Sequence, residues 1–150
     1  MNNTKTCYLD ANILVFFKES SSDQHDQAVS IIERLVADNF KLFVSPLALD
    51  EFLYAALRYL RKKNTHDQDI KKELKDLLSS ILEIPNLEII NPPTAKNLQI
   101  KVVDLITDFS LRPRDAYHLL IMKTHKIKYF LTFDSDFYKV FKANVVKSVR

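Results

Sequence analysis

Short apolar runs alternate with longer amphipathic segments along almost the whole chain, and this alternation limits the possible fold more than any other feature. The apolar runs at 6–9, 42–44, 87–90 and 129–132 contain many β-branched and aromatic residues, as strands do. The segments between them repeat apolar residues three and four positions apart, which is helical spacing. Strands that alternate with helices form a parallel sheet covered on both faces. We therefore predict an α/β fold.

Proline marks two of the expected helix starts. Its fixed φ suits the first turn, and its missing N–H is not needed there, so helices should begin at Pro46 and Pro113. No linker or repeat interrupts the chain, and we expect residues 1–150 to form a single domain. The expected helices cover 11–17, 24–38, 46–63, 67–82, 94–109, 113–126 and 136–141, and a short edge strand is expected at 144–146.

Composition excludes several classes of function. Glycine is absent from the 150 residues, which rules out the glycine-rich phosphate loops of P-loop and dinucleotide-binding proteins. The net charge of +3 permits a polyanionic partner without requiring one. A lone cysteine, Cys7, cannot form an internal disulfide, which favours a reducing compartment. Without a secretion signal or a long apolar run, we expect a cytoplasmic protein with no membrane segment.

Four acidic residues occupy positions that a parallel sheet would bring together. Asp10 and Asp134 each follow a predicted strand, and Asp115 lies in the first turn of a predicted helix. Glu51 lies in the second turn of a helix that also follows a strand. The carboxyl ends of parallel strands meet at one edge of a sheet, where open α/β folds bind ligands. Crowded carboxylates repel one another unless a cation such as Mg²⁺ or Mn²⁺ compensates.

Each acid also has an ordinary structural interpretation. Asp10, Asp115 and Asp134 are equally consistent with helix caps, because acids accept from free N–H groups and complement the helix dipole. Glu51 interrupts an apolar helix and cannot cap from inside it, although the neighbouring Asp50 is a rival candidate. These residues alone leave the choice between caps and a metal site open.

Four short motifs resemble, in order and approximate spacing, those of PIN-domain nucleases. Together they span nearly the whole chain, reading YLDANIL at 8–14, SPLALDEF at 45–52, PRDAYHL at 113–119 and LTFDSDF at 131–137. The family's second motif places its acid directly before Leu, Phe or Val, which selects Glu51 over Asp50. Phe133 departs from the pattern, because many relatives carry a small polar residue before the fourth acid.

The resemblance implies a three-layer α/β/α sandwich with a short parallel sheet, and a metal-dependent ribonuclease that is often the toxin of a VapBC-type toxin–antitoxin pair. The implied partners are an RNA substrate, a small antitoxin protein and a second copy of the chain. The acids implied as catalytic ligands of Mg²⁺ or Mn²⁺ are Asp10, Glu51, Asp115 and Asp134. The residues implied to support them are Asn12, Thr132 and Asp136.

Basic residues near the third motif have two interpretations. Arg112 and Arg114 flank Pro113, where their guanidinium groups could bind backbone phosphates or lie in a solvated loop. The helices at 46–63 and 67–82 carry several Lys and Arg, typical of a solvated face and also consistent with a track for RNA.

One histidine and a group of apolar side chains also have both a structural and a functional interpretation. His118 lies within a predicted helix and is expected to be structural, not a ligand. Four apolar or aromatic side chains either pack in the core or form a surface for an antitoxin segment or a second copy of the chain: Tyr54, Leu57, Tyr59 and Leu60.

Three other functions fit the sequence less well than a toxin nuclease. A housekeeping RNA-processing PIN nuclease would share the same acids. A non-catalytic RNA-binding module is disfavoured, because carboxylates without a metal repel phosphate. A receiver-like phospho-acceptor domain needs paired acids after its first strand, and Asp10-Ala11-Asn12 does not supply them.

Overall fold

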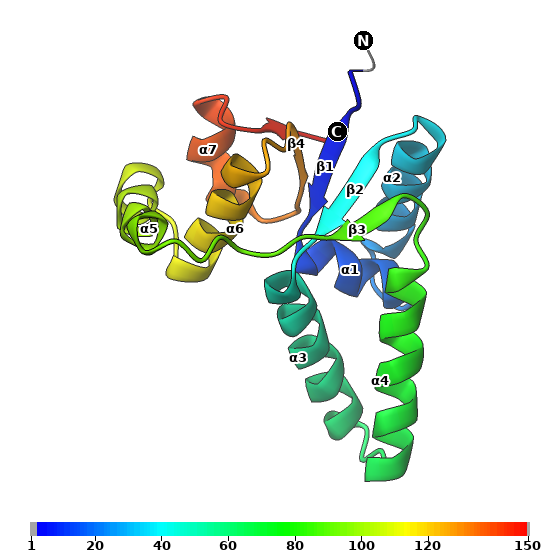
Figure 1. The fold of residues 1–150 in the computed structure, drawn as a ribbon. Helices are drawn as coiled ribbons and strands as arrows, with labels where there is room; N and C mark the ends of the chain where they lie inside the picture. The colour runs from blue at the N-terminus through cyan, green and yellow to red at the C-terminus, as the bar shows by residue number, and fades with distance from the viewer. Residues whose placement is uncertain (1–2, 150) are drawn as a thin grey trace.

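The computed structural model describes residues 3–149. Its five strands form one parallel sheet in the order β3-β2-β1-β4-β5 (Figure 1). The first strand along the chain is therefore the central one. The strands are β1 (Thr6–Leu9), β2 (Lys41–Val44), β3 (Leu87–Ile89), β4 (Tyr129–Leu131) and β5 (Lys147–Ser148).

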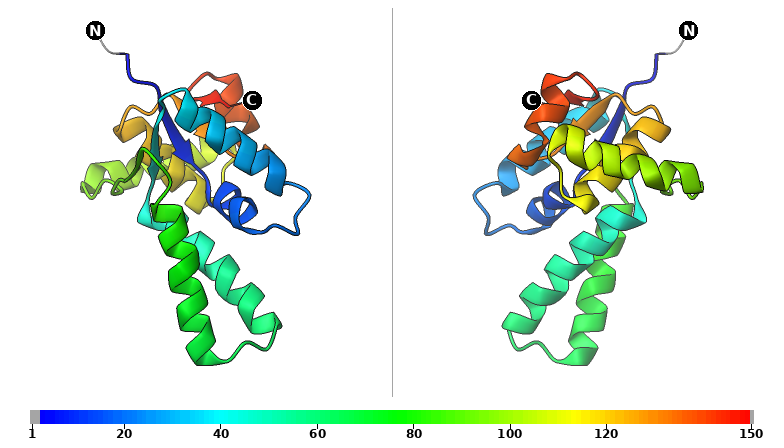
Figure 2. Two further views of the ribbon diagram at one scale, coloured as in Figure 1. Left: turned by 90° about the vertical axis from the view of Figure 1, so that its right-hand side faces the viewer. Right: turned by 90° about the vertical axis from the view of Figure 1, so that its left-hand side faces the viewer.

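Helices cover both faces of the sheet, so the predicted three-layer α/β/α sandwich with a short parallel sheet is confirmed (Figures 1 and 2). One face packs against α5, α6 and α7, and the opposite face against α1, α2 and the sheet-proximal parts of α3 and α4. The helices are α1 (Ala11–Lys18), α2 (His25–Ala37), α3 (Pro46–Lys62), α4 (Asp67–Leu82), α5 (Lys96–Phe109), α6 (Pro113–Thr124) and α7 (Tyr138–Lys142), with a 3₁₀ turn at Ser135–Phe137.

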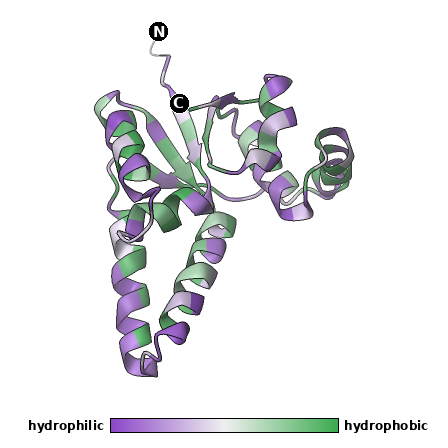
Figure 3. Ribbon diagram, turned by 180° about the vertical axis from the view of Figure 1, so that it is seen from behind, coloured by the Kyte–Doolittle hydropathy of each residue, from purple (hydrophilic) through white to green (hydrophobic). Residues whose placement is uncertain are grey.

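Alternation along β1 divides the core between the two faces. Tyr8 pairs in register with Phe43 of β2 and Phe130 of β4, and its side chain joins the core under α6. Its neighbours Cys7 and Leu9 point to the other face, as successive strand residues must, and pack under α1 and α2. Burial on both faces explains why the central strands are continuously apolar, as the green strands of Figure 3 show.

Helices α3 and α4 leave the sheet as an antiparallel pair that projects from the sandwich (Figure 2). Close to the sheet, Phe52 and Ile81 are buried in the core. Farther out, the loop between the helices is hydrophilic (Figure 3). Exposed basic side chains gather on this pair at Arg58, Arg61, Lys62, Lys63, Lys71, Lys72 and Lys75.

Left-handed residues end five of the helices without any glycine. In each case a residue one or two positions after the helix end has a φ between 53 and 57°, and the next N–H bonds to the carbonyl five positions back, as in a Schellman motif. Asparagine tolerates this conformation better than most residues, but Lys126 adopts it as well. The five positions are Asn39, Asn64, Ser110, Lys126 and Asn144.

Most predicted elements are present with ends shifted by one or two residues, but the edge strand was placed wrongly. Residues 144–146 form a turn and a bend, and the edge strand is β5 at Lys147–Ser148. Val145 and Val146 are apolar because they pack into the core under α7. The predicted helix at 136–141 is divided into the 3₁₀ turn and α7. Across residues 3–149, no helix is both long and apolar enough to span a membrane.

Candidate active site

The acids gather at the carboxyl ends of β1 and β4, where the strand order changes direction. From β1 the chain builds outward through β2 to β3, and later crosses over to add β4 and β5 on the other side of β1. Such a switch point leaves a crevice beyond the strand ends. Asp10 follows β1, Asp134 follows β4, and α6 begins beside them with Asp115 in its first turn.

Asp10 is both a helix cap and a member of the acidic site. Its Oδ1 accepts from the Ala11 N–H at 2.8 Å, and its Oδ2 accepts from the Thr132 hydroxyl at 2.6 Å. Only 7% of the residue is exposed. Burial raises the pKa of Asp10, although these hydrogen bonds from Thr132 and Ala11 oppose the shift. The two interpretations of this residue are therefore compatible.

Asn12 and Thr132 join the start of α1 to the loop after β4. The Asn12 amide nitrogen donates to Thr132 Oγ1 at 3.2 Å, and its Oδ1 accepts from the Phe133 N–H at 3.3 Å. Thr132 Oγ1 also accepts from the Asp134 N–H at 3.0 Å. These contacts hold the Asp134 loop against the Asp10 carboxylate. Phe133, the unusual residue of the fourth motif, packs its ring 5.7 Å from that of Phe16.

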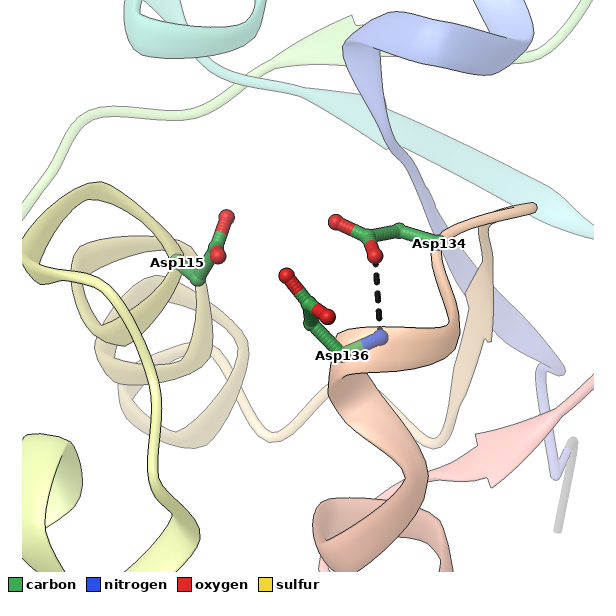
Figure 4. Close-up of side chains that lie close together, drawn as sticks. All are labelled: Asp115, Asp134 and Asp136. Carbon is green, nitrogen blue, oxygen red and sulfur yellow. Dashed lines mark hydrogen bonds between the residues drawn. The ribbon is translucent and has the colours of Figure 1, made fainter.

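Asp115, Asp134 and Asp136 direct carboxylates into one space (Figure 4). One oxygen from each lies within 4.8 Å of the other two. The Asp136 N–H donates to Asp134 Oδ1 at 2.9 Å, which fixes Asp134 as the cap of the 3₁₀ turn. Partial burial, and then the negative charges of Asp134 and Asp10, raise the pKa of Asp115 to about 6.

Glu51 reaches the same region from α3, whereas Asp50 beside it is exposed. Glu51 Oε1 lies 2.6 Å from His118 Nε2, and its charge is one of those that raise the pKa of Asp115. The His118 contact was missed from the sequence. The spacing of Asp115 and His118, three positions apart on one helix, places both on one face, but it does not indicate the contact with Glu51.

The remaining site candidates are exposed. Arg112 is the residue before α6, and its Nη2 lies 3.8 Å from Asp136 Oδ2. Arg114 is exposed in the first turn of α6. Arg112 therefore borders the acidic space from its solvent side.

The donor set fits a divalent cation. The three carboxylate oxygens that lie within 4.8 Å of one another are hard donors, the type that Mg²⁺ and Mn²⁺ prefer. The raised pKa of Asp115 is the expected result of like charges brought together without a compensating cation. Asp10 and Glu51 flank this group and interact electrostatically with Asp115.

Comparison with known proteins gives a match over most of the chain. The family described as PIN domain matches residues 7–142. A curated relative, ribonuclease VapC2 of Methanocaldococcus jannaschii, is 27% identical over 137 residues, covering 89% of this chain and 87% of the relative.

Several solved structures share the fold at low sequence identity. FitAcB from Neisseria gonorrhoeae has a TM-score of 0.68 at 15% identity, covering 96% of each chain. VapBC2 from Rickettsia felis, bound to a DNA fragment from its promoter, has a TM-score of 0.66 at 17% identity, covering 96% of this chain and 97% of that one. Mycobacterium tuberculosis VapC20, a toxin that cleaves the sarcin-ricin loop, has a TM-score of 0.63 at 14% identity, covering 89% and 94%.

Proposed function

The chain belongs to the PIN-domain family, and from that membership we propose that it is a metal-dependent endoribonuclease and the toxin of a VapBC-type pair. The observation that carries this proposal is the convergence of Asp115, Asp134 and Asp136 on one space, with Asp10 and Glu51 beside it. The ribonuclease name of the archaeal relative supports RNA as the substrate. We propose that residues 1–150 act as one nuclease domain in the cytoplasm, where its RNA substrates are.

In the mechanism that we propose, the protein supplies a rigid set of oxygen donors. Asp10, Glu51, Asp115 and Asp134 would hold Mg²⁺ or Mn²⁺, and Asp136, whose carboxylate converges with those of Asp115 and Asp134, would contribute to the same site. A bound divalent cation supplies an activated water and neutralises charge that develops on the phosphate. The Thr132 hydroxyl keeps Asp10 in place through their 2.6 Å hydrogen bond.

Arg112 and Arg114 would bind the RNA backbone beside the cleaved bond. Arg112 contacts Asp136, Arg114 is exposed one residue before Asp115, and guanidinium groups match the geometry of phosphate oxygens. The 3.8 Å contact between Arg112 and Asp136 is long enough for Arg112 to exchange this partner for a phosphate.

An apolar groove between α1, α3 and α4 would receive the antitoxin. It has a volume of about 640 Å³ and includes Val15, Phe52, Tyr54, Tyr59 and Leu77 in its lining. Tyr54 is 66% exposed and Tyr59 is 44% exposed, whereas Leu60 is buried in the core. Apolar side chains from an antitoxin segment would cover these tyrosines, as in other complexes in which a helix binds a groove.

A second copy of the chain would bind the outer face of α5. Ile100 and Val103 are three positions apart on this helix and are 71% and 56% exposed. The molar mass in solution, compared between the wild type and Ile100→Lys, tests this homodimer.

Cleavage of a mixed RNA pool tests the nuclease. We expect the purified protein to cut RNA with Mn²⁺ or Mg²⁺ and to stop with EDTA. Asp115→Asn and Asp10→Asn should fold normally and lose at least about 100-fold in rate, because each removes a charged oxygen from the proposed cation site.

The controls separate the possible readings of this experiment. Asp50→Asn removes a neighbouring exposed acid and should retain full activity. Equal cutting by the wild type and Asp115→Asn would reject the proposed site. Growth arrest on expression, relieved by a small protein from the adjacent gene, would distinguish a toxin from a housekeeping RNA-processing nuclease.

A further inference from the structure

A chain of buried polar groups runs from the backbone of α3 through the core to Glu51. The Ala48 N–H donates to Ser45 Oγ at 3.3 Å, and Ser45 Oγ lies 2.6 Å from the Tyr8 hydroxyl. The Tyr8 hydroxyl lies 2.7 Å from His118 Nδ1, and His118 Nε2 lies 2.6 Å from Glu51 Oε1. Ser45, Tyr8 and His118 are buried, so water does not share the bonds among these three, whereas the Glu51 side chain at the end of the chain is 23% exposed.

Only one direction of donation satisfies every member of this chain. Ser45 Oγ already accepts from a backbone N–H, and its own hydrogen can be given to the Tyr8 oxygen. The Tyr8 hydrogen then goes to His118 Nδ1, so the imidazole carries its proton on Nε2 and donates to Glu51. Each hydroxyl donates once and accepts once.

The opposite direction leaves a buried group unsatisfied. If His118 Nδ1 carried a hydrogen, the Tyr8 hydroxyl would accept it and donate to Ser45. The Ser45 hydrogen would then have no acceptor within a fully buried environment, at a cost of about 1–3 kcal/mol.

The chain joins elements that the site needs in fixed positions. Tyr8 is on β1, Ser45 caps α3, and His118 is on α6, one turn after Asp115. A glutamate side chain has several rotatable bonds, so an unsupported Glu51 would lose rotamer entropy when it binds a cation or substrate. A charge-assisted hydrogen bond from a buried imidazole removes that freedom in advance.

We infer that His118 is a positioning residue for Glu51, held as the Nε2–H tautomer by Tyr8 and Ser45. The interior of the protein, and not solvent, thus fixes one carboxylate of the candidate metal site. This inference rests on the proposed function for its effect on metal binding. Partners that orient metal-binding groups in this way typically change metal affinity by about 10–100-fold when they are removed.

Three substitutions in the chain of buried polar groups test the inference. His118→Leu removes the donor but fills the core, His118→Gln keeps an N–H donor, and Tyr8→Phe removes only the hydroxyl that fixes the tautomer. The control Met122→Ala damages the same helix at a fully buried position in the core beneath it. Mn²⁺ affinity by calorimetry, kcat and KM for RNA, and Tm are measured for each.

We expect His118→Leu to weaken Mn²⁺ binding by at least about 10-fold and to lower kcat, with a smaller effect on KM. His118→Gln should regain most of the affinity, and Tyr8→Phe should fall between the two. Met122→Ala should lose stability but keep the wild-type affinity for Mn²⁺. Wild-type affinity in His118→Leu, or an equal loss in Met122→Ala, would overturn the inference.

The tautomer can be tested without a metal. We expect ¹⁵N NMR of the metal-free protein to show His118 as Nε2–H, with this preference lost in Tyr8→Phe. An Nδ1–H tautomer in the wild type would overturn the inference independently of any activity. If the wild type showed the Nε2–H tautomer but bound no Mn²⁺ and cut no RNA, the proposed function would be rejected. The hydrogen-bonded chain that positions Glu51 would still be supported.

Discussion

At the scale of single residues, Asp115 shows most clearly how the proposed site would lower the stability of the metal-free protein. Its pKa is raised from 3.8 to about 6, mainly by burial and then by the charges of Asp134 and Asp10. Between these two pH values the folded protein binds more protons at this site than the unfolded chain. The metal-free protein should therefore gain stability as the pH falls from 7 through 6, and lose it again as the pH rises.

The direction of this pH dependence of stability can be measured by comparing the wild type with one variant. In EDTA, the Tm of the wild type relative to that of Asp115→Asn should rise between pH 7 and pH 5, because only the wild type has this carboxylate to neutralise. The raised pKa of Asp10 acts in the same direction in both proteins and largely cancels in the difference. A Tm difference that is constant over this range would contradict the assignment. With Mn²⁺ added, the trend should reverse, since the cation binds the deprotonated acid.

The sequence carried enough information to locate most of the site residues but not their contacts. Asp10 and Asp134 follow strands, so the expected parallel sheet already placed them at one edge. The choice of Glu51 over Asp50 came from resemblance, because helical spacing alone does not distinguish neighbouring acids. The hydrogen bond between Glu51 and His118 joins residues 67 positions apart, and no local pattern reports such a contact.

At the scale of helices and strands, a chain without glycine must end its helices at some cost. Lys126 follows α6 with a φ of 55°, a conformation that crowds its Cβ. We expect Lys126→Gly to raise the free energy of unfolding by about 1 kcal/mol, or the Tm by about 2–4 °C. Urea and thermal unfolding would measure the gain.

Asn39→Gly is the matched control for this effect. Asn39 has a φ of 57° at the end of α2, but asparagine tolerates this region, so its gain should be smaller than that of Lys126→Gly. Equal gains at both positions would show that Cβ crowding at Lys126 is not the cause.

Helices were easier to predict than the end of the sheet, for a physical reason. The helix at Asp67–Leu82 was predicted with its observed bounds, because an amphipathic period repeats over many residues. The edge strand β5 consists of only two residues, and both are exposed. Neither an apolar run nor an alternation of apolar and polar residues therefore marks it in the sequence. The apolar pair Val145-Val146 beside it was mistaken for the strand, although it belongs to the core under α7.

At the scale of the whole molecule, the α3–α4 pair projects from the sandwich (Figure 2) and carries the exposed Arg and Lys side chains named above. If it contacts RNA, replacing Arg58 and Arg61 by Gln should flatten the dependence of log affinity on log salt by about 1.4, or about 0.7 per lost phosphate contact. Binding would be measured in the Asp115→Asn background, which should retain RNA without cutting it.

A charge-matched control tests whether Arg58 and Arg61 contact RNA or only form a solvated face of the α3–α4 pair. Lys126→Gln with Lys128→Gln removes the same charge next to the N-terminal end of β4, the opposite edge of the sheet from the acids. That pair should leave the salt dependence nearly unchanged. An equal change for both pairs would mean that net charge alone governs binding.

The order of strands in the sheet also has a consequence for the synthesis of this protein. Thr132, the hydrogen-bond partner of Asp10, is made 122 positions after it, and Asp134 and Asp136 come later still. The central strand β1 must therefore wait for β4 before the acids can meet. A ribosome that makes this chain therefore cannot present the assembled acidic site to its own message until the residues up to Asp136 have left the exit tunnel.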